Sequence, residues 1–386
     1  MVYSMNVGGV EKSLLGLLSS LPLDRLDVHV GIVHSKGGFL PYLPKKVEVH
    51  EIDIYKKLWP LLKQPPLVSV KQLYHKGCYW DAIVFFSLYI LSKIQNSRYW
   101  IYKYLLRNEP LFNEYFDLAI AYAGPSADID YFICEKVKAK NKVGWIHFDV
   151  SKFGIDKGLI RQLYKQYKRI FVVSDTGKQI FDQMFPMFRY KTEVFYNIVS
   201  PEQVLTLAAT ATTFSDNYTG KRILTVGRIA IEKGQREAIH ALCELVGKGL
   251  DVKWYFVGEG NDMESCRSLV KELGLKDRIV FLGCQTNPYG YMRDCDVYVQ
   301  PSRHEGFCIT LAEALCFENP IVATNFTGAH EQLDTRANGV VCAMDKQSIA
   351  EAISKVLTMK KCKPENREPE QIDVLLDILE DNGRAC

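Results

Sequence analysis

The chain has 386 residues, a hydrophobic fraction of 47%, a charged fraction of 24% and a formal net charge of +3. This length exceeds what one typical hydrophobic core accommodates and predicts two domains, and the composition excludes a disordered or fibrous protein. The net charge is too small to indicate nucleic acid as a partner.

The eleven cysteines are odd in number, with no Cys-x-x-Cys pair and no histidine at zinc spacing. We therefore expect reduced thiols, a cytosolic location and no metal site. Interruptions in the first apolar segment also argue against a signal peptide.

The amino-terminal stretch predicts a short strand, a glycine loop and a helix. Only residues 1–4 clearly precede the loop with Gly8 and Gly9, so the first strand is at most a stub, and either native residues are missing or the strand is short. Leucines at helical spacing follow. The glycines are thus expected at a strand-to-helix turn, where backbone can approach a phosphate or a bound sugar.

Residues 55–107 differ in composition from the rest of the chain. Their lysines and arginines are opposed by one acid, Asp81, and aromatic residues are interleaved throughout. This composition is typical of a surface that lies on an anionic bilayer, and equally of helices with a solvated basic face and an aromatic core. Single-stranded nucleic acid would also suit it, but the motifs described below make that the weaker interpretation. The longest apolar run, residues 82–91, is about half of a membrane span.

The remainder of the first half alternates between strand and helix signals. Apolar stretches at 117–122, 142–147 and 170–174 predict strands, and His147 and Ser174 end two of them. Ligands of open α/β sheets bind at the carboxyl ends of strands, so His147 is a candidate site residue, although a lone histidine is more often structural. For Ser174 we expect a minor positioning role or a helix cap. A strand at 194–197 precedes residues 200–220, whose lack of pattern predicts the interdomain linker.

The second half alternates more regularly, which predicts a parallel sheet with crossover helices. Its strands are expected at 222–226, 252–257, 278–282, 296–300, 320–323 and 340–342. Arg228 and Lys233 follow the first of these between Gly227 and Gly234, so two cations converge on the mouth of the sheet and predict a diphosphate site. The loop containing Gly258 opens onto the same crevice and is expected to line a base pocket.

The stretch 300–315 carries the strongest functional signal. It predicts a strand end, a loop with Glu305 and Gly306, and a helix from Gly306 to Leu315 that carries Glu313. Gly306 lets a ligand approach, and the unpaired N–H groups of Phe307, Cys308 and Ile309 at the helix start predict an anion site. Two carboxylates beside a phosphate make sense if they accept hydrogen bonds from sugar or ribose hydroxyls. The motif therefore predicts a sugar nucleotide as ligand.

Three of these stretches resemble the retaining glycosyltransferases of the GT-B fold, of the family 4 type known as glycosyl transferases group 1. The carboxylates Glu305 and Glu313 are similar to the family's acidic pair, residues 226–234 to its phosphate loop and residues 7–11 to its glycine loop. The resemblance implies two Rossmann-like, doubly wound parallel-sheet domains facing across a cleft. Residues 1–199, with the first strand truncated, would bind the acceptor, and residues 200–386 would bind the nucleotide sugar.

The resemblance also implies an activity. A hexose would pass from a nucleoside diphosphate sugar, most commonly a UDP-sugar, to a saccharide or lipid-linked saccharide acceptor with retained configuration, in bacterial surface polysaccharide assembly. Glu305, His147, Arg228 and Lys233 would be catalytic, and the donor would be bound by Gly8, Gly9, Gly227, Gly258, Gly306, Phe307, Cys308, Ile309 and Glu313. No cofactor or metal would be needed, because cations and amides stabilise the leaving diphosphate. Frequent lipid-linked acceptors in the family favour the membrane interpretation of residues 55–107, with the enzyme cytoplasmic and peripheral on the inner face of the cell membrane.

Three alternatives remain open from the sequence. The fold is shared by phosphorylases and by sugar-nucleotide epimerases, and a truncated or non-catalytic protein could retain nucleotide-sugar binding. Asp128-Ile129-Asp130 and Asp294-Cys295-Asp296 fit the acidic metal motif of a different glycosyltransferase fold, but so short a pattern arises by chance, and we expect neither to bind a metal.

Overall fold

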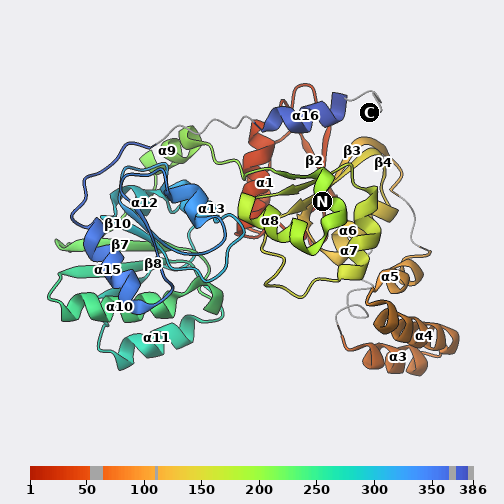
Figure 1. Ribbon diagram of the computed structural model, residues 1–386, viewed down its shortest axis with the longest axis horizontal. Coiled ribbons are helices and arrows are strands. Elements are labelled where there is room, and N and C mark those ends of the chain that lie inside the picture. Colours follow the sequence, from red (N-terminus) through yellow and green to blue (C-terminus); the bar gives the residue numbers. More distant parts are fainter. Residues whose placement is uncertain (53–63, 109–111, 365–370, 381–386) are drawn as a thin grey trace. The chain divides into compact units, whose positions relative to one another are not determined.

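The computed structural model describes residues 1–52, 64–108, 112–364 and 371–380 (Figure 1). Contacts within the chain define two compact units. The first comprises Met1–Val173, Lys178–Tyr196 and Glu370–Cys386, and the second comprises Ser174–Gly177 and Asn197–Pro369. Both are α/β structures with parallel sheets, as the sequence predicts.

The second unit contains a six-stranded parallel sheet in the order β12-β11-β10-β7-β8-β9. The strands are β7 (Lys221–Val226), β8 (Val252–Val257), β9 (Ile279–Phe281), β10 (Val297–Gln300), β11 (Ile321–Thr324) and β12 (Gly339–Cys342). The chain builds outward from β7 to β9, then returns to the other side of β7 with β10. The strand order therefore reverses between β7 and β10, which is the position where open α/β sheets form their ligand crevice.

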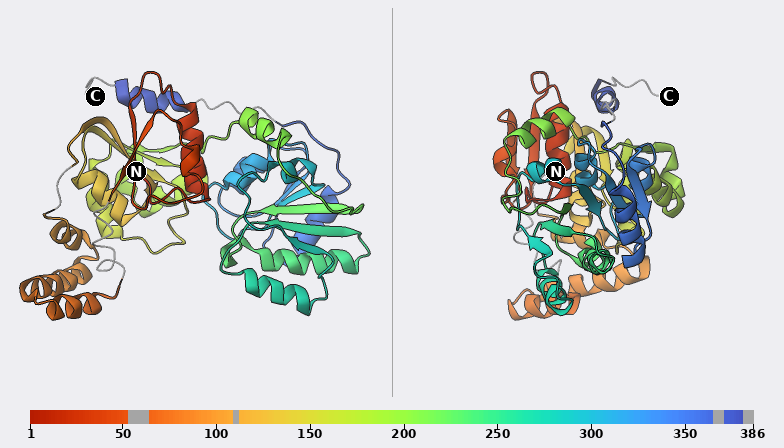
Figure 2. Two further views of the ribbon diagram at one scale, coloured as in Figure 1. Left: turned by 180° about the vertical axis from the view of Figure 1, so that it is seen from behind. Right: turned by 90° about the vertical axis from the view of Figure 1, so that its left-hand side faces the viewer.

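Helices cover both faces of this sheet. One face packs against α10 (Gln235–Gly247), α11 (Met263–Glu272) and α15 (Lys346–Val356). The other packs against α9 (Pro201–Ala209), α12 (Tyr289–Asp294), α13 (Ile309–Ala314) and α14 (Ala329–Leu333). The result is three layers, with one apolar core on each side of the strands. Figure 2 shows the helices and the sheet from behind.

The expected linker at 200–220 contains helix α9, so the prediction of an unpatterned segment was wrong in part. Ser200 caps the helix by accepting a hydrogen bond from the backbone N–H of Gln203 at 3.3 Å, and Pro201 occupies the first turn. Val204 and Ala208, one turn apart, are buried against the sheet. An apolar stripe of so few residues is too sparse to distinguish from a loop by pattern alone.

The first unit contains a two-stranded sheet and a four-stranded sheet joined by the amino-terminal residues. The two-stranded sheet consists of β1 (Val28–Ile32) and β2 (Val47–Glu51). The four-stranded sheet consists of β3 (Tyr115–Gly124), β4 (Lys138–Ile146), β5 (Arg169–Val172) and β6 (Thr192–Val194). Neighbouring strands are parallel in both sheets. Val2 bonds to β1 through Gly31 O at 2.9 Å and the Val33 N–H at 3.2 Å, and Met1 O accepts from Tyr122 of β3 at 3.2 Å. The predicted stub thus lies in the first-strand position, giving the strand order β2-β1-stub-β3-β4-β5-β6. The last strand ends at Val194, before the predicted Asn197.

Helices also cover the sheet of the first unit. Its core contains buried residues of α6 (Ala127–Glu135), α7 (Lys157–Leu163) and α8 (Asp175–Met184), with 3-10 turns at Leu40–Tyr42, Tyr164–Gln166 and Pro186–Lys191. Helices α1 (Gly9–Ser20) and α16 (Ile372–Glu380) together line an apolar cavity of about 200 Å³. The amide of Asn141 on β4 donates to Ile378 O at 2.9 Å, so α16 lies in the first unit although the expected boundaries placed it in residues 200–386.

Three helices project from the first unit between β2 and β3: α3 (Pro66–His75), α4 (Tyr79–Gln95) and α5 (Tyr99–Leu105) (Figure 1). The group is anchored by the backbone N–H of Arg98, which donates to Asp156 at 2.8 Å, and by the Tyr102 hydroxyl, which donates to Asp128 at 2.5 Å. Residues 55–63 of the predicted basic stretch lie outside the described residues. Among the helices that the structure describes, none is long and apolar enough to cross a bilayer.

The acidic pair Asp128 and Asp130 is buried inside the first unit. Asp128 accepts from the Tyr3 hydroxyl at 2.8 Å, and Asp130 accepts from the Tyr167 hydroxyl at 2.6 Å and from the Ser126 N–H at 2.7 Å. Burial raises the pKa of Asp130 to about 7, with these hydrogen bonds opposing the shift. Hydroxyl and amide donors surround both carboxylates, which gives them a structural role.

Candidate functional site

The loops that follow β7 and β10 meet at the point where the strand order reverses. The Arg303 N–H donates to Glu232 O at 2.8 Å. Gly234 has φ +70°, and a Cβ there would lie 1.8 Å from Pro301 O, so only glycine allows the two loops to approach this closely. Both predicted motifs, residues 226–234 and residues 300–315, are therefore brought together in the crevice.

The Lys233 ammonium and the Glu305 carboxylate form the centre of this site. Lys233 Nζ donates to Glu305 Oε1 at 2.6 Å, with 22% and 10% of the two side chains exposed. Burial alone would lower the pKa of Lys233, but attraction to Glu305 outweighs it and raises the pKa above its ordinary value. Lys233 is therefore a permanent cation held at the mouth of the sheet.

A network of neutral side chains fixes the position of Glu305. Ser302 Oγ donates to Glu305 Oε1 at 2.7 Å, and the Gln300 amide donates to Ser302 Oγ at 2.9 Å. The Gln300 carbonyl oxygen accepts from Tyr298 at 2.7 Å and from Thr310 at 3.2 Å. None of these residues was predicted from the sequence to support Glu305. Their proximity to Glu305 in the sequence was the available signal.

Glu313 is almost fully buried on α13, with 2% of its surface exposed. The Tyr289 hydroxyl on α12 donates to Glu313 Oε1 at 2.8 Å, and burial raises the pKa of Tyr289, which keeps the hydroxyl protonated. Tyr289 lies 24 positions away in the sequence, so no local pattern could have linked it to Glu313.

Helix α13 begins at Ile309, so the prediction of a helix starting at Gly306 was wrong by three residues. Cys308 precedes the helix in the left-handed region, at φ +67°, and the Gln332 side chain donates to Phe307 O. Gly306, Phe307 and Cys308 therefore belong to the loop between β10 and α13. Burial raises the pKa of the Cys308 thiol, which is therefore uncharged.

Arg228 and the neighbouring glycines shape the other wall of the crevice. The exposed Arg228 guanidinium donates to Glu232 at 2.6 Å, and its carbonyl accepts from the Gln235 amide at 2.9 Å. A Cβ on Gly227 would meet open space, whereas a Cβ on Gly258, at φ +138°, would lie 2.0 Å from Gly227 O. Gly258 thus permits close contact between two loops, and Gly227 leaves backbone accessible.

Gly8, Gly9 and His147 lie in the first unit. Helix α1 begins at Gly9, and Gly8 is its N-cap in an extended conformation, as the predicted strand-to-helix turn requires. A Cβ on Gly8 would lie 2.5 Å from a carboxylate oxygen of Glu11. Burial raises the pKa of Glu11, the last residue of the predicted glycine loop, for which the sequence predicted no separate role. Ser174 accepts from the Gly177 N–H at 3.1 Å, the expected helix cap.

His147 follows β4 directly and is nine-tenths buried. Its ring stacks with Trp145 at 6.2 Å and lies 4.6 Å from the Tyr122 ring. Burial lowers the pKa of His147 to about 3, so the imidazole is neutral at physiological pH. Within the part of the chain that the structure describes, Nε2 of His147 has no hydrogen-bond partner.

Comparisons with known proteins find similar sequences and similar structures. Residues 214–370 match the family described as "Glycosyl transferases group 1". A Campylobacter jejuni protein named N-acetylgalactosamine-N,N'-diacetylbacillosaminyl-diphospho-undecaprenol 4-alpha-N-acetylgalactosaminyltransferase is 26% identical over 349 residues, covering 90% of this chain and 86% of that protein. The capsular polysaccharide biosynthesis glycosyltransferase CapM of Staphylococcus aureus is 32% identical over 140 residues, covering 34% and 35%.

Solved structures share the fold over nearly the whole chain. HepE of Anabaena, crystallised with UDP and glucose, superposes with a TM-score of 0.62 at 20% identity, covering 92% of this chain and 89% of that one. The two α/β units, each built on parallel strands, and the site where the β7 and β10 loops meet define a glycosyltransferase of the GT-B fold. Within that class, residues 214–370 match the glycosyl transferases group 1 family.

Proposed function

We propose that this enzyme moves a hexose from UDP-sugar to a lipid-linked saccharide with retention of configuration, at the cytoplasmic face of the membrane, during bacterial surface polysaccharide assembly. The observation that carries the proposal is the Lys233–Glu305 pair where the β7 and β10 loops meet. Residues 1–199 are proposed to bind the acceptor and residues 200–386 the donor. UDP in the HepE crystals and the diphospho-undecaprenol in the name of the Campylobacter relative support the two substrate classes.

The proposed chemistry uses the cations of the second unit. Lys233 and Arg228 bind the diphosphate, and the backbone around Gly227 and Gly306 lets its oxygens approach. The bond between the anomeric carbon and the phosphate oxygen breaks while the acceptor oxygen bonds to the same face. The leaving phosphate takes the acceptor proton, so no side-chain base is required.

The carboxylates are proposed to select the sugar and the nucleoside. The hydrogen bonds described for Glu305 all end on Oε1, and we assign Oε2 to a hydroxyl of the transferred sugar. Glu313 is assigned to the ribose hydroxyls. His147 remains a proposed catalytic residue, with its neutral imidazole available to a sugar hydroxyl through Nε2.

A cavity in the first unit suits the acceptor. It has a volume of about 830 Å³ and is lined by residues that follow the strands, including Tyr3, Pro125 and Phe148. Lys93 and Arg98 contribute cations to the same lining. A cavity of this size accommodates a small saccharide, and two cations at its wall suit the diphosphate of a lipid-linked acceptor.

The exposed faces of α3 and α4 are proposed to lie on an anionic bilayer. One stripe of α4 exposes large apolar side chains three or four positions apart, from Trp80 (74% exposed) to Ile94 (77%): Trp80, Ile83, Phe86, Ile90 and Ile94. Over residues 64–108, six lysines and arginines are opposed by Asp81 alone. Apolar side chains at the interface and cations at the headgroups together favour a membrane surface over a solvated face.

A donor screen tests the proposed reaction. Purified enzyme is incubated with UDP-, GDP- and ADP-sugars, with and without a bacterial lipid extract, and released nucleotide is measured beside a Glu313→Gln variant. We expect release from one UDP-sugar that rises with the extract. Interconversion of donors without acceptor would instead indicate an epimerase, and sugar phosphate formed from free phosphate would indicate a phosphorylase. Nucleotide binding without turnover would indicate a non-catalytic protein.

Vesicle sedimentation tests the membrane surface. The enzyme is expected to sediment with phosphatidylglycerol vesicles and to remain in solution with phosphatidylcholine vesicles. Trp80→Ser combined with Ile83→Ser should abolish sedimentation. Leu205→Ser is the matched control, since Leu205 is similarly exposed on α9 of the second unit. Equal sedimentation of both variants would refute the role of α4.

A further inference from the structure

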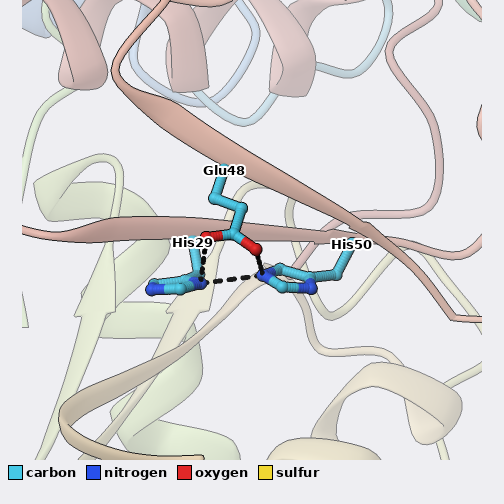
Figure 3. A group of neighbouring side chains, drawn as sticks. All are labelled: His29, Glu48 and His50. Atoms are coloured by element: carbon cyan, nitrogen blue, oxygen red, sulfur yellow. Dashed lines mark hydrogen bonds and ion pairs between the residues drawn. The ribbon is translucent and has the colours of Figure 1, made fainter.

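Two histidines face each other on the outer strands of the first unit. The parallel register pairs His29 of β1 with Glu48 of β2, and Gly31 with His50. Side chains alternate along strands, so Glu48 and His50 project from the same face of β2. Figure 3 shows these two side chains converging with His29: Nδ1 of His29 lies 2.7 Å from Nε2 of His50, and the Glu48 carboxylate lies 3.8 Å and 3.4 Å from these nitrogens.

The three side chains offer ligand atoms of a kind that metals bind. One atom from each lies within 4.8 Å of the other two. Two imidazoles and a carboxylate are typical ligands of zinc and similar divalent ions, whereas magnesium and calcium prefer oxygen alone. Glu114, just before β3, lies 3.6 Å from His29 Nδ1 but outside this group of three. We propose that His29, Glu48 and His50 form a binding site for a divalent transition-metal ion such as zinc.

A second carboxylate orients His29 for this role. Asp27 Oδ2 lies 3.3 Å from Nε2 of His29, on the side of the ring away from the cluster. If Nε2 carries the proton and donates to Asp27, the lone pair of Nδ1 points to the cluster, as in many carboxylate–histidine–metal sites. Phe116 and Phe112 pack edge-on against His29 and His50 at 5.3 Å each. Only 15% and 21% of the two histidine side chains are exposed, so both rings are held before any ion binds.

Charge and geometry together favour a cation. Three carboxylates, those of Asp27, Glu48 and Glu114, lie within 3.8 Å of the His29 ring nitrogens. The competing interpretation is a simple hydrogen bond between the imidazoles, which the 2.7 Å separation also fits. Zinc at about 2.0–2.1 Å from each nitrogen, in a tetrahedral site, keeps the nitrogens about 3.3 Å apart. Binding therefore requires the rings to separate by about 0.6 Å.

The position of the cluster indicates a structural role. His29 and Glu48 are each the second residue of their strand, near the amino ends. Ligand crevices of such sheets lie at the carboxyl ends of the strands, whereas His29 and Glu48 lie toward the opposite ends and His50 is the fourth of five residues in β2. The ion would connect β1 with β2 and stabilise the edge of the sheet by binding the folded state.

Zinc titration of chelator-treated enzyme tests the site. A competing chromophoric chelator reports affinity, and thermal unfolding reports stability. We expect one zinc per chain and a raised unfolding temperature, and we expect His29→Gln and His50→Gln each to weaken affinity at least a hundredfold. His330→Gln is the matched control: His330 is an exposed histidine 2.8 Å from the single carboxylate of Asp334, and its loss should leave zinc affinity unchanged.

Two further measurements keep the test decisive. If a histidine variant fails to fold, Glu48→Gln changes an exposed side chain and should still weaken zinc binding with the circular dichroism unchanged. Cobalt substitution should give the intense visible absorption of tetrahedral nitrogen and oxygen coordination, and His50→Gln should abolish it. Zinc affinity that is equal in wild type and His29→Gln, or absent from the wild type, would overturn the proposal in favour of the imidazole hydrogen bond.

Discussion

The two units place their charged groups differently. In the second unit, the charges of the site are paired at the mouth of the sheet, as between Lys233 and Glu305 and between Arg228 and Glu232. In the first unit, Asp130 and His147 are buried among aromatic rings and hydroxyls, and burial shifts their pKa values toward the neutral form. The site charges of the second unit are thus available to a ligand, whereas burial in the first unit favours the neutral forms of Asp130 and His147.

The largest effect is expected from removing the cation of the second unit. Lys233→Ala should lower turnover by about 10²–10³-fold, since one electrostatic contact to a leaving group contributes roughly that much, and should change donor binding less. Lys221→Ala is the matched control, because Lys221 pairs with Asp296 at 2.9 Å on the exposed side of β7. Steady-state kinetics with the identified donor measure both. Unchanged turnover in Lys233→Ala would contradict the proposed binding of the leaving diphosphate by Lys233, and with it the contrast between the two units.

A smaller effect is expected at the buried carboxylate. Glu313→Gln should raise the donor KM about tenfold with less change in turnover, because the amide keeps the shape of the side chain but accepts one fewer hydrogen bond from ribose. Tyr289→Phe removes the hydroxyl that donates to Glu313 and should raise the KM severalfold. Comparing UDP-sugar with its 2′-deoxy analogue separates the ribose contact from general damage. An equal loss for both donors would contradict the ribose assignment.

The buried titratable groups of the first unit should make its stability depend on pH. The unfolded chain binds a proton on His147 below about pH 6.5, whereas the folded chain resists it down to about pH 3, so this residue costs stability as the pH falls. Asp130 acts in the opposite direction: its raised pKa stabilises the fold at low pH and that contribution is lost as the pH rises toward about 7.

On going from pH 7 to pH 5, the free energy of unfolding of His147→Phe should therefore rise by about 2 kcal/mol relative to that of the wild type. The part of the pH dependence that comes from Asp130 should be the same in both proteins. Urea unfolding midpoints at the two pH values measure this difference. His304→Gln, which changes an exposed histidine, should show the wild-type dependence. A parallel shift of His147→Phe and wild type would mean that the imidazole is protonated in the folded enzyme.

Sequence patterns predicted the second unit better than the first. Its strands are short, buried and regularly spaced, and the glycine, cationic and acidic motifs lie directly after them, so Lys233 and Glu305 could be found from spacing. The partners of these residues were missed where they come from distant elements, as Tyr289 does. Helix α9 was also missed, because its stability comes from tertiary burial.

In the first unit, the stub at residues 1–3 gains its strand character from β1 and β3 on either side. The histidine cluster was missed because 21 residues separate His29 from His50, and only the register of β1 and β2 brings them together.

The bond between Asn141 and Ile378 spans 237 positions of the chain. Residues 197–369 of the second unit form one uninterrupted segment, whereas the first unit needs residues from both ends of the sequence. A ribosome adds about 5–20 residues each second, so α16 arrives on the order of ten seconds or more after β4. The second unit can complete its core during that interval, while the side of β4 near Asn141 waits for its last helix. Order of synthesis and order of completion are therefore reversed: the half made first is finished last.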